Sequence, residues 1–189
     1  MEPSYIILTI IKHNNGKFIG KTLLQKTVFF LNELLRLGIP FKPHYYGPYS
    51  SEVAVAIENL VALGFLKEVE ESFPVWDVWG EVRRYIYELT DEGEEILSDI
   101  KSHPQYNNIL EQLNLIGTYS ESKDYDKLSK AAKIYYIVKA KEKINRNGIK
   151  KEANKLGWSL EDKEINNLSS FLEELNLVKN VKRHSKTKF

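Results

Sequence analysis

Apolar side chains recur every three to four residues in the first third of the chain, which is the spacing of one helix face. This pattern predicts a helix over residues 4–13, a second over 20–37 and a third that begins at Ser50 or Ser51. Gly64 is expected to end the third helix, because glycine tolerates the left-handed conformation that often follows a helix.

The period then changes from helical to alternating. Residues 65–70 and 83–89 predict two β-strands, and residues 71–82 predict the loop between them. Thr90 is expected to cap a fourth helix over 91–101, which carries acidic side chains in its first turn, where the helix dipole favours them. Three helices, two strands and a helix follow one another in the order of a winged helix-turn-helix domain.

Pro104 interrupts this pattern and predicts a boundary between a winged-helix domain of residues 1–103 and a second domain of residues 104–189. The second domain is predicted to be helical. Its expected elements are helices over 104–116, 126–146 and 149–156, a helix from the N-cap Ser159 to Leu175, and a strand over 177–182. The predicted fold class is therefore mainly α, of the α+β type.

Residues 57–69 and 168–181 form a weak internal repeat. In each copy a helix passes through a residue that tolerates the left-handed conformation, Gly64 or Asn176, into an apolar segment. The second domain is therefore expected to be either a plain helical unit or a second winged helix.

Composition narrows the class of protein. The 189 residues include no cysteine, which excludes disulfides and Cys-ligated zinc, and the 42% of hydrophobic residues suffice for a packed core. No run of about 18 apolar residues occurs, and we expect no secretory signal, no membrane segment and a cytoplasmic location. The four histidines lack metal-ligand spacing, so we expect no metal, no cofactor and no enzymatic activity.

Charge is distributed unevenly, although the net charge is only +1. Residues 1–64 sum to +2, residues 65–105 to −7 and residues 106–189 to +6. Such asymmetry indicates contact with nucleic acid or charge pairing within the chain. Residues 123–155 carry eleven Lys or Arg against four acids. We expect this stretch either to follow a phosphate backbone or to form a solvated helix face, which could also dock on residues 65–105.

Two motifs resemble those of a known family. Leu24-Gln25-Lys26 in the second predicted helix and Tyr46-Gly47-Pro48 before the third are similar to motifs of a prokaryotic winged-helix family related to the antitoxin-associated Panacea domain. Residues 87–94 loosely resemble the segment after the wing in PadR- and MarR-like regulators. The resemblance covers residues 5–100. It implies a winged-helix fold, with relatives that include transcription regulators and antitoxins.

The third predicted helix is the expected recognition helix for double-stranded DNA. Its outward face is predicted to comprise Ser51, Glu52, Val55, Glu58, Asn59 and Ala62. Asn59 is suited to read an adenine, Val55 to contact a thymine methyl group and Ser51 to bind a phosphate. Glu52 and Glu58 would repel phosphates, and this face carries no Arg or Lys, which argues against DNA binding.

The segment of residues 42–49 leads into this helix. Lys42, His44 and Tyr46 are candidate phosphate contacts, because a cation, an imidazole and a phenol all donate hydrogen bonds. In the structural alternative, Gly47 and Pro48 fix the turn while the tyrosines pack beneath it.

Arg83 and Arg84 enter the second predicted strand and are candidates for contact with a minor groove. The alternative is exposed pairing with the hairpin carboxylates Glu68, Glu70 and Glu81.

Two functions stay open at this level: a dimeric, DNA-binding transcription regulator, and an antitoxin- or adaptor-like protein-interaction module with the same fold. Trp76 and Trp79, in an apolar and acidic loop, favour a protein partner. A homodimer is predicted from the apolar side chains of the second half, namely Ile134, Tyr135, Ile137, Val138, Ile144, Phe171 and Leu172.

Overall fold

The computed structural model describes residues 1–74, 81–141 and 143–178, and in this part of the chain the protein is mainly helical with one small antiparallel sheet. The N-terminal elements are α1 (Pro3–His13), β1 (Lys17–Ile19), α2 (Lys21–Leu35), α3 (Ser51–Ala62), β2 (Leu66–Pro74), β3 (Glu81–Leu89) and α4 (Asp91–Lys101). The elements that follow are α5 (Tyr106–Gly117), a short 3₁₀ turn (Ser120–Lys123), α6 (Tyr125–Lys141), α7 (Arg146–Lys155) and α8 (Asp162–Glu174).

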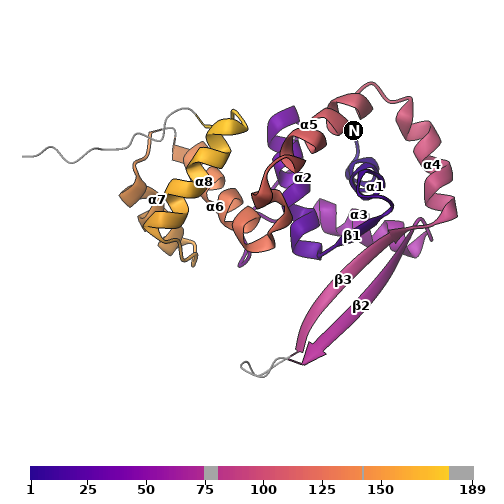
Figure 1. Ribbon diagram of the computed structural model, residues 1–189, viewed down its shortest axis with the longest axis horizontal. Coiled ribbons are helices and arrows are strands. Elements are labelled where there is room, and N and C mark those ends of the chain that lie inside the picture. Colours follow the sequence, from indigo (N-terminus) through magenta and orange to yellow (C-terminus); the bar gives the residue numbers. More distant parts are fainter. Residues whose placement is uncertain (75–80, 142, 179–189) are drawn as a thin grey trace, which may run out of the picture.

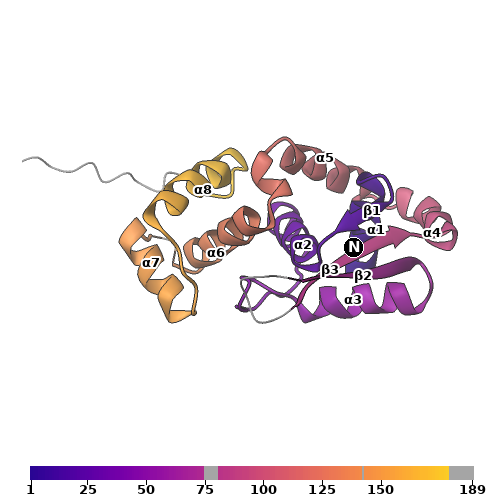
Figure 2. The same cartoon turned by 60° about the horizontal axis from the view of Figure 1, so that its bottom comes forward.

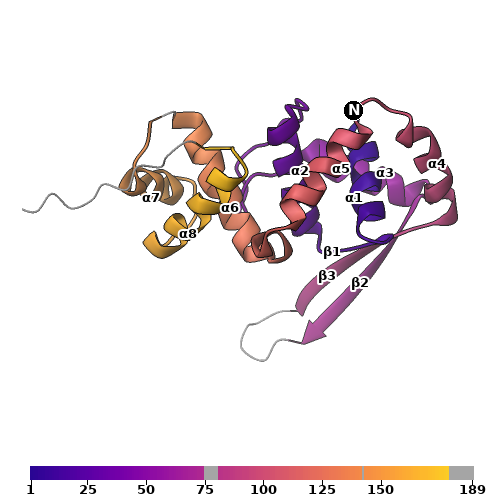
Figure 3. The same cartoon turned by 45° about the horizontal axis from the view of Figure 1, so that its top comes forward.

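The described chain forms an elongated molecule (Figure 1). Helices α6, α7 and α8 lie at one end, α4 lies at the other, and α1, α2 and α5 lie between them. Figure 2 shows α3 running beneath the sheet, and Figure 3 shows the β2–β3 hairpin projecting from the helical body. Helix α3 and the hairpin are thus neighbouring surface elements.

Helix α1 is the centre of the N-terminal half. Residues 6–11 of α1 are all buried, which is the pattern of a helix covered on every side rather than of a surface helix. Helices α3, α4 and α5 and the sheet pack around it.

The sheet has the strand order β1-β3-β2, and both pairings are antiparallel. Phe18 of β1 lies opposite Tyr87 of β3, and both side chains are buried. Strand β1 was not predicted, because three residues are too few to show an alternating pattern. The predicted loop over 71–82 is also partly wrong, since β2 extends to Pro74 and pairs in register with Glu81.

Several predicted boundaries in the second half are corrected. The predicted helix over 126–146 is too long: α6 ends at Lys141 and Arg146 already begins α7. Ser159 is not the N-cap of α8; Glu161 is, in a capping box with Glu164. The predicted strand over 177–182 lies mostly outside the described residues.

The internal repeat is confirmed at its turns. Gly64 and Asn176 both have positive φ, 80° and 56°. The Phe65 N–H donates to the Leu60 carbonyl over 2.9 Å, and the Leu177 N–H donates to the Leu172 carbonyl over 3.0 Å. Both helices therefore end with the same hydrogen-bonded turn.

The two halves share one buried cluster of side chains. Helix α5 packs on α1 and α2, and α6 packs on α2 and α8. The cluster includes apolar residues of the second half from which a homodimer was predicted: Ile134, Tyr135, Ile137, Phe171 and Leu172. The expectation that these side chains offer free apolar surface is wrong, because they are buried within the chain. The homodimer itself stays a prediction.

Candidate functional site

Helix α3 presents to solvent the face that the sequence predicts. Its exposed residues include Ser51, Glu52, Val55, Glu58, Asn59 and Ala62. Lys21, at the start of α2, has its Nζ 4.0 Å from Glu58 Oε1 and brings one cation to the edge of this face. Val55 is 52% exposed, and Leu63, directly after the helix, is 67% exposed. The face therefore combines acidic and apolar groups.

The Leu-Gln-Lys motif and the Tyr-Gly-Pro motif meet in space, because Gln25 of α2 hydrogen-bonds to the backbone of Ser50. Gln25 Nε2 donates to the Ser50 carbonyl over 3.0 Å, and the Ser50 N–H donates to Gln25 Oε1 over 3.1 Å. Ser50 is the N-cap of α3, and its Oγ accepts from the Val53 N–H. Gln25 and Ser50 are buried, so water does not compete for these bonds. The motif pair thereby fixes where α3 begins.

Lys26, the next residue of the motif, holds the turn. Its Nζ donates to the Pro48 carbonyl over 2.7 Å, and the residue is 2% exposed. Gly47 has a φ of +97°, and a Cβ at this position would lie 3.3 Å from the Ser129 carbonyl of α6. The turn is therefore pressed between α2 and α6, where only glycine fits without strain.

Trp158, which follows α7, anchors the other side of the turn. Its indole Nε1 donates to the His44 carbonyl over 2.7 Å, and the side chain is 1% exposed. Lys42 and Tyr49 exchange two backbone hydrogen bonds of 2.9 Å that close the loop. The main chain of the turn is thus held by Lys26, by Trp158 and by the hydrogen bonds between Lys42 and Tyr49.

The side chains at the tip of the turn are left free for contact. Tyr45 and Tyr46 are 73% and 52% exposed and meet edge to face, with ring centroids 4.8 Å apart. The expectation that the tyrosines pack beneath the turn is wrong for these two residues, because the anchoring groups bind carbonyls rather than rings. Lys42 and His44 are also exposed. The turn therefore gathers Lys42, His44 and Tyr46 on one rigid support.

The burial of Lys26 has an electrostatic cost. Burial, together with the nearby ammonium of Lys133, lowers the pKa of Lys26 to about 7. One carbonyl hydrogen bond replaces only part of the hydration that a lysine has in water. Sequence reasoning missed this lysine and Trp158 as anchors of the turn, because a lysine is normally read as a surface residue. The signal that points to Lys26 is the pairing of the two motifs.

The hairpin arginines are paired with glutamates of β2. Arg84 donates from Nε and Nη2 to Glu71 Oε2 over 2.9 and 2.5 Å, and Arg83 Nε lies 3.3 Å from Glu70 Oε1. Consecutive strand residues point to opposite faces, so the two pairs lie on opposite faces of the hairpin, with side chains 38% to 59% exposed. Trp76 and Trp79 fall outside the described residues.

The ion pairs of the Lys-rich stretch 123–155 involve Lys127, Lys130, Lys139, Lys141, Lys150 and Lys155. Lys130 Nζ lies 2.6 Å from carboxylate oxygens of both Asp126 and Glu164, and Lys139 Nζ lies 2.7 Å from Glu33 Oε2. In the described part of the chain, the ion pairs of this stretch lead to its own carboxylates, to α2 and to α8, and none leads to residues 65–105. Docking of the stretch on that acidic block stays a prediction.

Asn59 also borders a cavity of about 620 Å³ between α1, the end of α3 and α4. Among residues 1–74, 81–141 and 143–178, no group of three or more His, Asp or Glu side chains is arranged to hold a metal ion. In the same residues, every helix is too short or too polar to cross a membrane.

Comparison with known proteins places the chain in a family. No protein-family model matches the sequence. The chain is similar to the uncharacterized protein YwgA of Bacillus subtilis strain 168, with 30% identity over 146 residues that cover 69% of this chain and 80% of YwgA. With the similarity extending over most of both chains, this protein belongs to the family of YwgA.

Proposed function

We propose that residues 1–103 form a winged helix-turn-helix domain that binds double-stranded DNA as a transcription regulator, with α3 as the recognition helix and the β2–β3 hairpin as the wing. The observation that carries the proposal is the position of α3. A buried pair of motifs fixes its first residue, its outer face is exposed, and the hairpin projects beside it. In helix-turn-helix proteins this arrangement carries base contacts on the recognition helix and phosphate contacts around it.

Further support comes from the turn that leads into α3. Lys42, His44 and Tyr46 are exposed on a rigid loop next to the first turn of the helix, where phosphate contacts position a duplex. Arg83 and Arg84 would contribute from the wing by exchanging Glu70 and Glu71 for phosphates. The resemblance to Panacea and to PadR- and MarR-like proteins is consistent with this fold and stays a prediction.

The second candidate is a protein-interaction module, and the chemistry of the α3 face favours it. Glu52 and Glu58 are exposed there together with Val55 and Leu63. An acidic face with apolar groups suits a partner with a basic and apolar surface. A homodimer partner remains part of both candidates.

The two functions are separated by neutralising the acids of α3. In a gel-shift assay at about 50 mM salt, Glu52→Gln/Glu58→Gln is expected to bind duplex DNA several-fold more tightly than wild type, because two repulsive charges leave the interface. Glu111→Gln/Glu174→Gln removes the same charge from exposed positions on α5 and α8, which lie away from α3 (Figure 2), and should change affinity much less.

Replacing Arg83 and Arg84 by Ala is expected to weaken binding to all sequences and to reduce the slope of log affinity against log salt by roughly two. If neither wild type nor the α3 variant shifts any duplex, the proposal is overturned and the protein-interaction module is the remaining candidate. Equal effects of the α3 variant and the Glu111/Glu174 control variant would show that α3 does not contact the DNA.

A further inference from the structure

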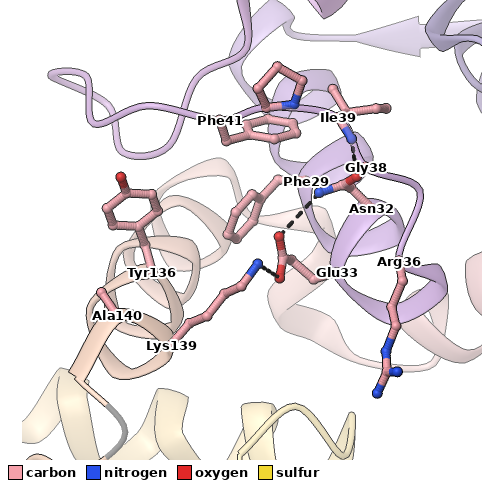
Figure 4. Close-up of a pocket in the computed structure, with 11 residues that line it drawn as sticks. Phe29, Asn32, Glu33, Arg36, Gly38, Ile39, Phe41, Tyr136, Lys139 and Ala140 are labelled. Carbon is pink, nitrogen blue, oxygen red and sulfur yellow. Dashed lines mark hydrogen bonds and ion pairs between the residues drawn. The ribbon is translucent and has the colours of Figure 1, made fainter.

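A cavity of about 570 Å³ lies between the end of α2, residues 38–41 and α6. Figure 4 shows its walls, which include the rings of Phe29, Phe41 and Tyr136. Phe29 and Phe41 pack edge to face with centroids 5.1 Å apart. A cavity of this size and aromatic character is typical of small-molecule sites. It is formed by elements other than the α3 face and the hairpin, so it is independent of the proposed DNA contacts.

The acidic residue in the lining of this cavity is Glu33. Its side chain is only 7% exposed, and its Oε2 accepts a hydrogen bond of 2.7 Å from Lys139 Nζ. Asn32 Nδ2 donates to Oε1 over 3.1 Å. Asn32 in turn accepts from the Ile39 N–H over 2.8 Å, which fixes residues 38–41 over the cavity. The carboxylate is therefore held in one position by α2 and α6.

Lys139 differs from Asn32, because its side chain is 58% exposed. A long, flexible and solvated side chain thus places an ammonium on a nearly buried carboxylate beside aromatic rings. The cavity already binds one ammonium group, and the group is supplied by a side chain that is free to leave. Arg36, the second cation of the lining, points away from the other lining residues in Figure 4.

Charge decides which ligands this arrangement accepts. An anionic ligand that recruits Lys139 would strip Glu33 of its cation and leave a nearly buried carboxylate uncompensated, which is strongly unfavourable. A cationic ligand replaces the Lys139 ammonium one for one and keeps Glu33 paired. Aromatic rings add to the preference, because their faces attract cations.

We propose that this cavity is a binding site for a small organic amine, whose primary ammonium group displaces Lys139 from Glu33 while an apolar body packs against Phe29, Phe41 and Tyr136. Lys139 acts as an internal competitor that closes the site when no amine is present. Removing Lys139 should therefore strengthen binding of the amine. At a site where the amine does not compete with Lys139, the same substitution would leave the affinity unchanged.

The test uses 2-phenylethylamine as the probe and the melting temperature and isothermal titration calorimetry as readouts. Lys139→Ala is expected to be less stable than wild type in buffer and to be stabilised by the amine in a saturable manner. Its affinity for the amine should be at least about tenfold higher than that of wild type. Two molecules with the same body, 3-phenylpropionate and 2-phenylethanol, serve as matched controls and should give little or no stabilisation. Sodium chloride at equal concentration controls for ionic strength.

Glu33→Gln/Lys139→Ala removes both members of the pair and should abolish the amine response. If Lys139→Ala fails to fold in buffer, recovery of the folded state by the amine supports the site, and Lys139→Met provides a second variant that retains the apolar stem. The proposal is overturned if the carboxylate or the alcohol stabilises the protein as well as the amine does. It is equally overturned if affinity is unchanged between wild type and the Lys139 variants.

Discussion

The buried Lys26 fixes the position of the turn before α3, and its burial lowers the stability of the fold. Its ammonium is buried against the Pro48 carbonyl, and no carboxylate pairs with it among its hydrogen-bond and ion-pair partners in the described residues. Burial lowers the pKa of Lys26 to about 7, so a proton on this group destabilises the folded state. The hydrogen bond that positions the turn at Pro48 explains why a lysine is buried here.

Replacing Lys26 by Met should flatten the dependence of stability on pH. The pKa of Lys26 is about 7 in the folded state and 10.5 for an ordinary lysine, so between these values the unfolded state binds more protons and the free energy of unfolding rises with pH. The rise attributable to Lys26 is at most about 1.4 kcal/mol per pH unit. Urea unfolding of wild type and Lys26→Met between pH 7 and pH 10 measures the difference.

The variant also loses the hydrogen bond to Pro48, at a cost of about 1–3 kcal/mol that does not depend on pH. The slope rather than the absolute stability is therefore the diagnostic quantity. Lys163→Met, at an exposed position on α8, is the control and should keep the wild-type slope. Parallel pH profiles for wild type and Lys26→Met would contradict the assigned pKa.

At the scale of elements, α4 is locked to the base of the hairpin by a close approach at Gly93. A Cβ on Gly93 would lie 2.3 Å from the carbonyl oxygen of Phe65. Thr90 caps α4 and donates from its hydroxyl to the Gly64 carbonyl over 2.7 Å. The end of α3, the start of β2 and the start of α4 therefore form one junction.

Gly93→Ala should destabilise the protein by about 2–4 kcal/mol, because the methyl group meets backbone atoms that cannot rotate away. Gly117→Ala, in a helix position with no atom within 4 Å of the added Cβ, is the matched control. This control is expected to be neutral or slightly stabilising, since Ala is the better helix former. Chemical unfolding measures the stability of both variants. Equal stabilities of Gly93→Ala and Gly117→Ala would show that the junction accommodates the added methyl group.

At the scale of the molecule, the apolar core does not stop at the predicted boundary near Pro104. Helix α5 covers α1 and α2, and Phe30 of α2 meets Phe171 of α8 edge to face at 5.9 Å. Tyr119 also contacts the ring of Phe171, at 5.4 Å. The two halves are thus joined by side chains that are buried in both.

We expect the whole chain to unfold in a single cooperative transition, with equal calorimetric and van't Hoff enthalpies. Phe171→Ala should lower the midpoint of the whole transition by removing about 3–5 kcal/mol of core packing, without splitting it. Scanning calorimetry combined with hydrogen exchange of α1 and α8 amides tests this expectation. Two separate transitions, or loss of protection confined to α8, would show that the halves are independent domains.

The sequence alone determined most of the helices and the order of the elements. Helical periodicity, the caps Ser50 and Thr90 and the left-handed turns at Gly64 and Asn176 act within a few residues, so their pattern is readable along the chain. The exposed face of α3 was predicted for the same reason. Lys42, His44 and Tyr46 were chosen from local chemistry, and the structure brings them together on one turn.

Only the tertiary structure decided which charged groups are buried and which are paired. Lys26 lies 22 residues from Pro48, Trp158 lies 114 residues from His44, and Lys139 lies 106 residues from Glu33. Strand β1 likewise exists because β3 pairs with it. Periodicity reports the environment of a residue along its own element, whereas desolvation and ion pairing depend on side chains that folding brings from distant parts of the chain.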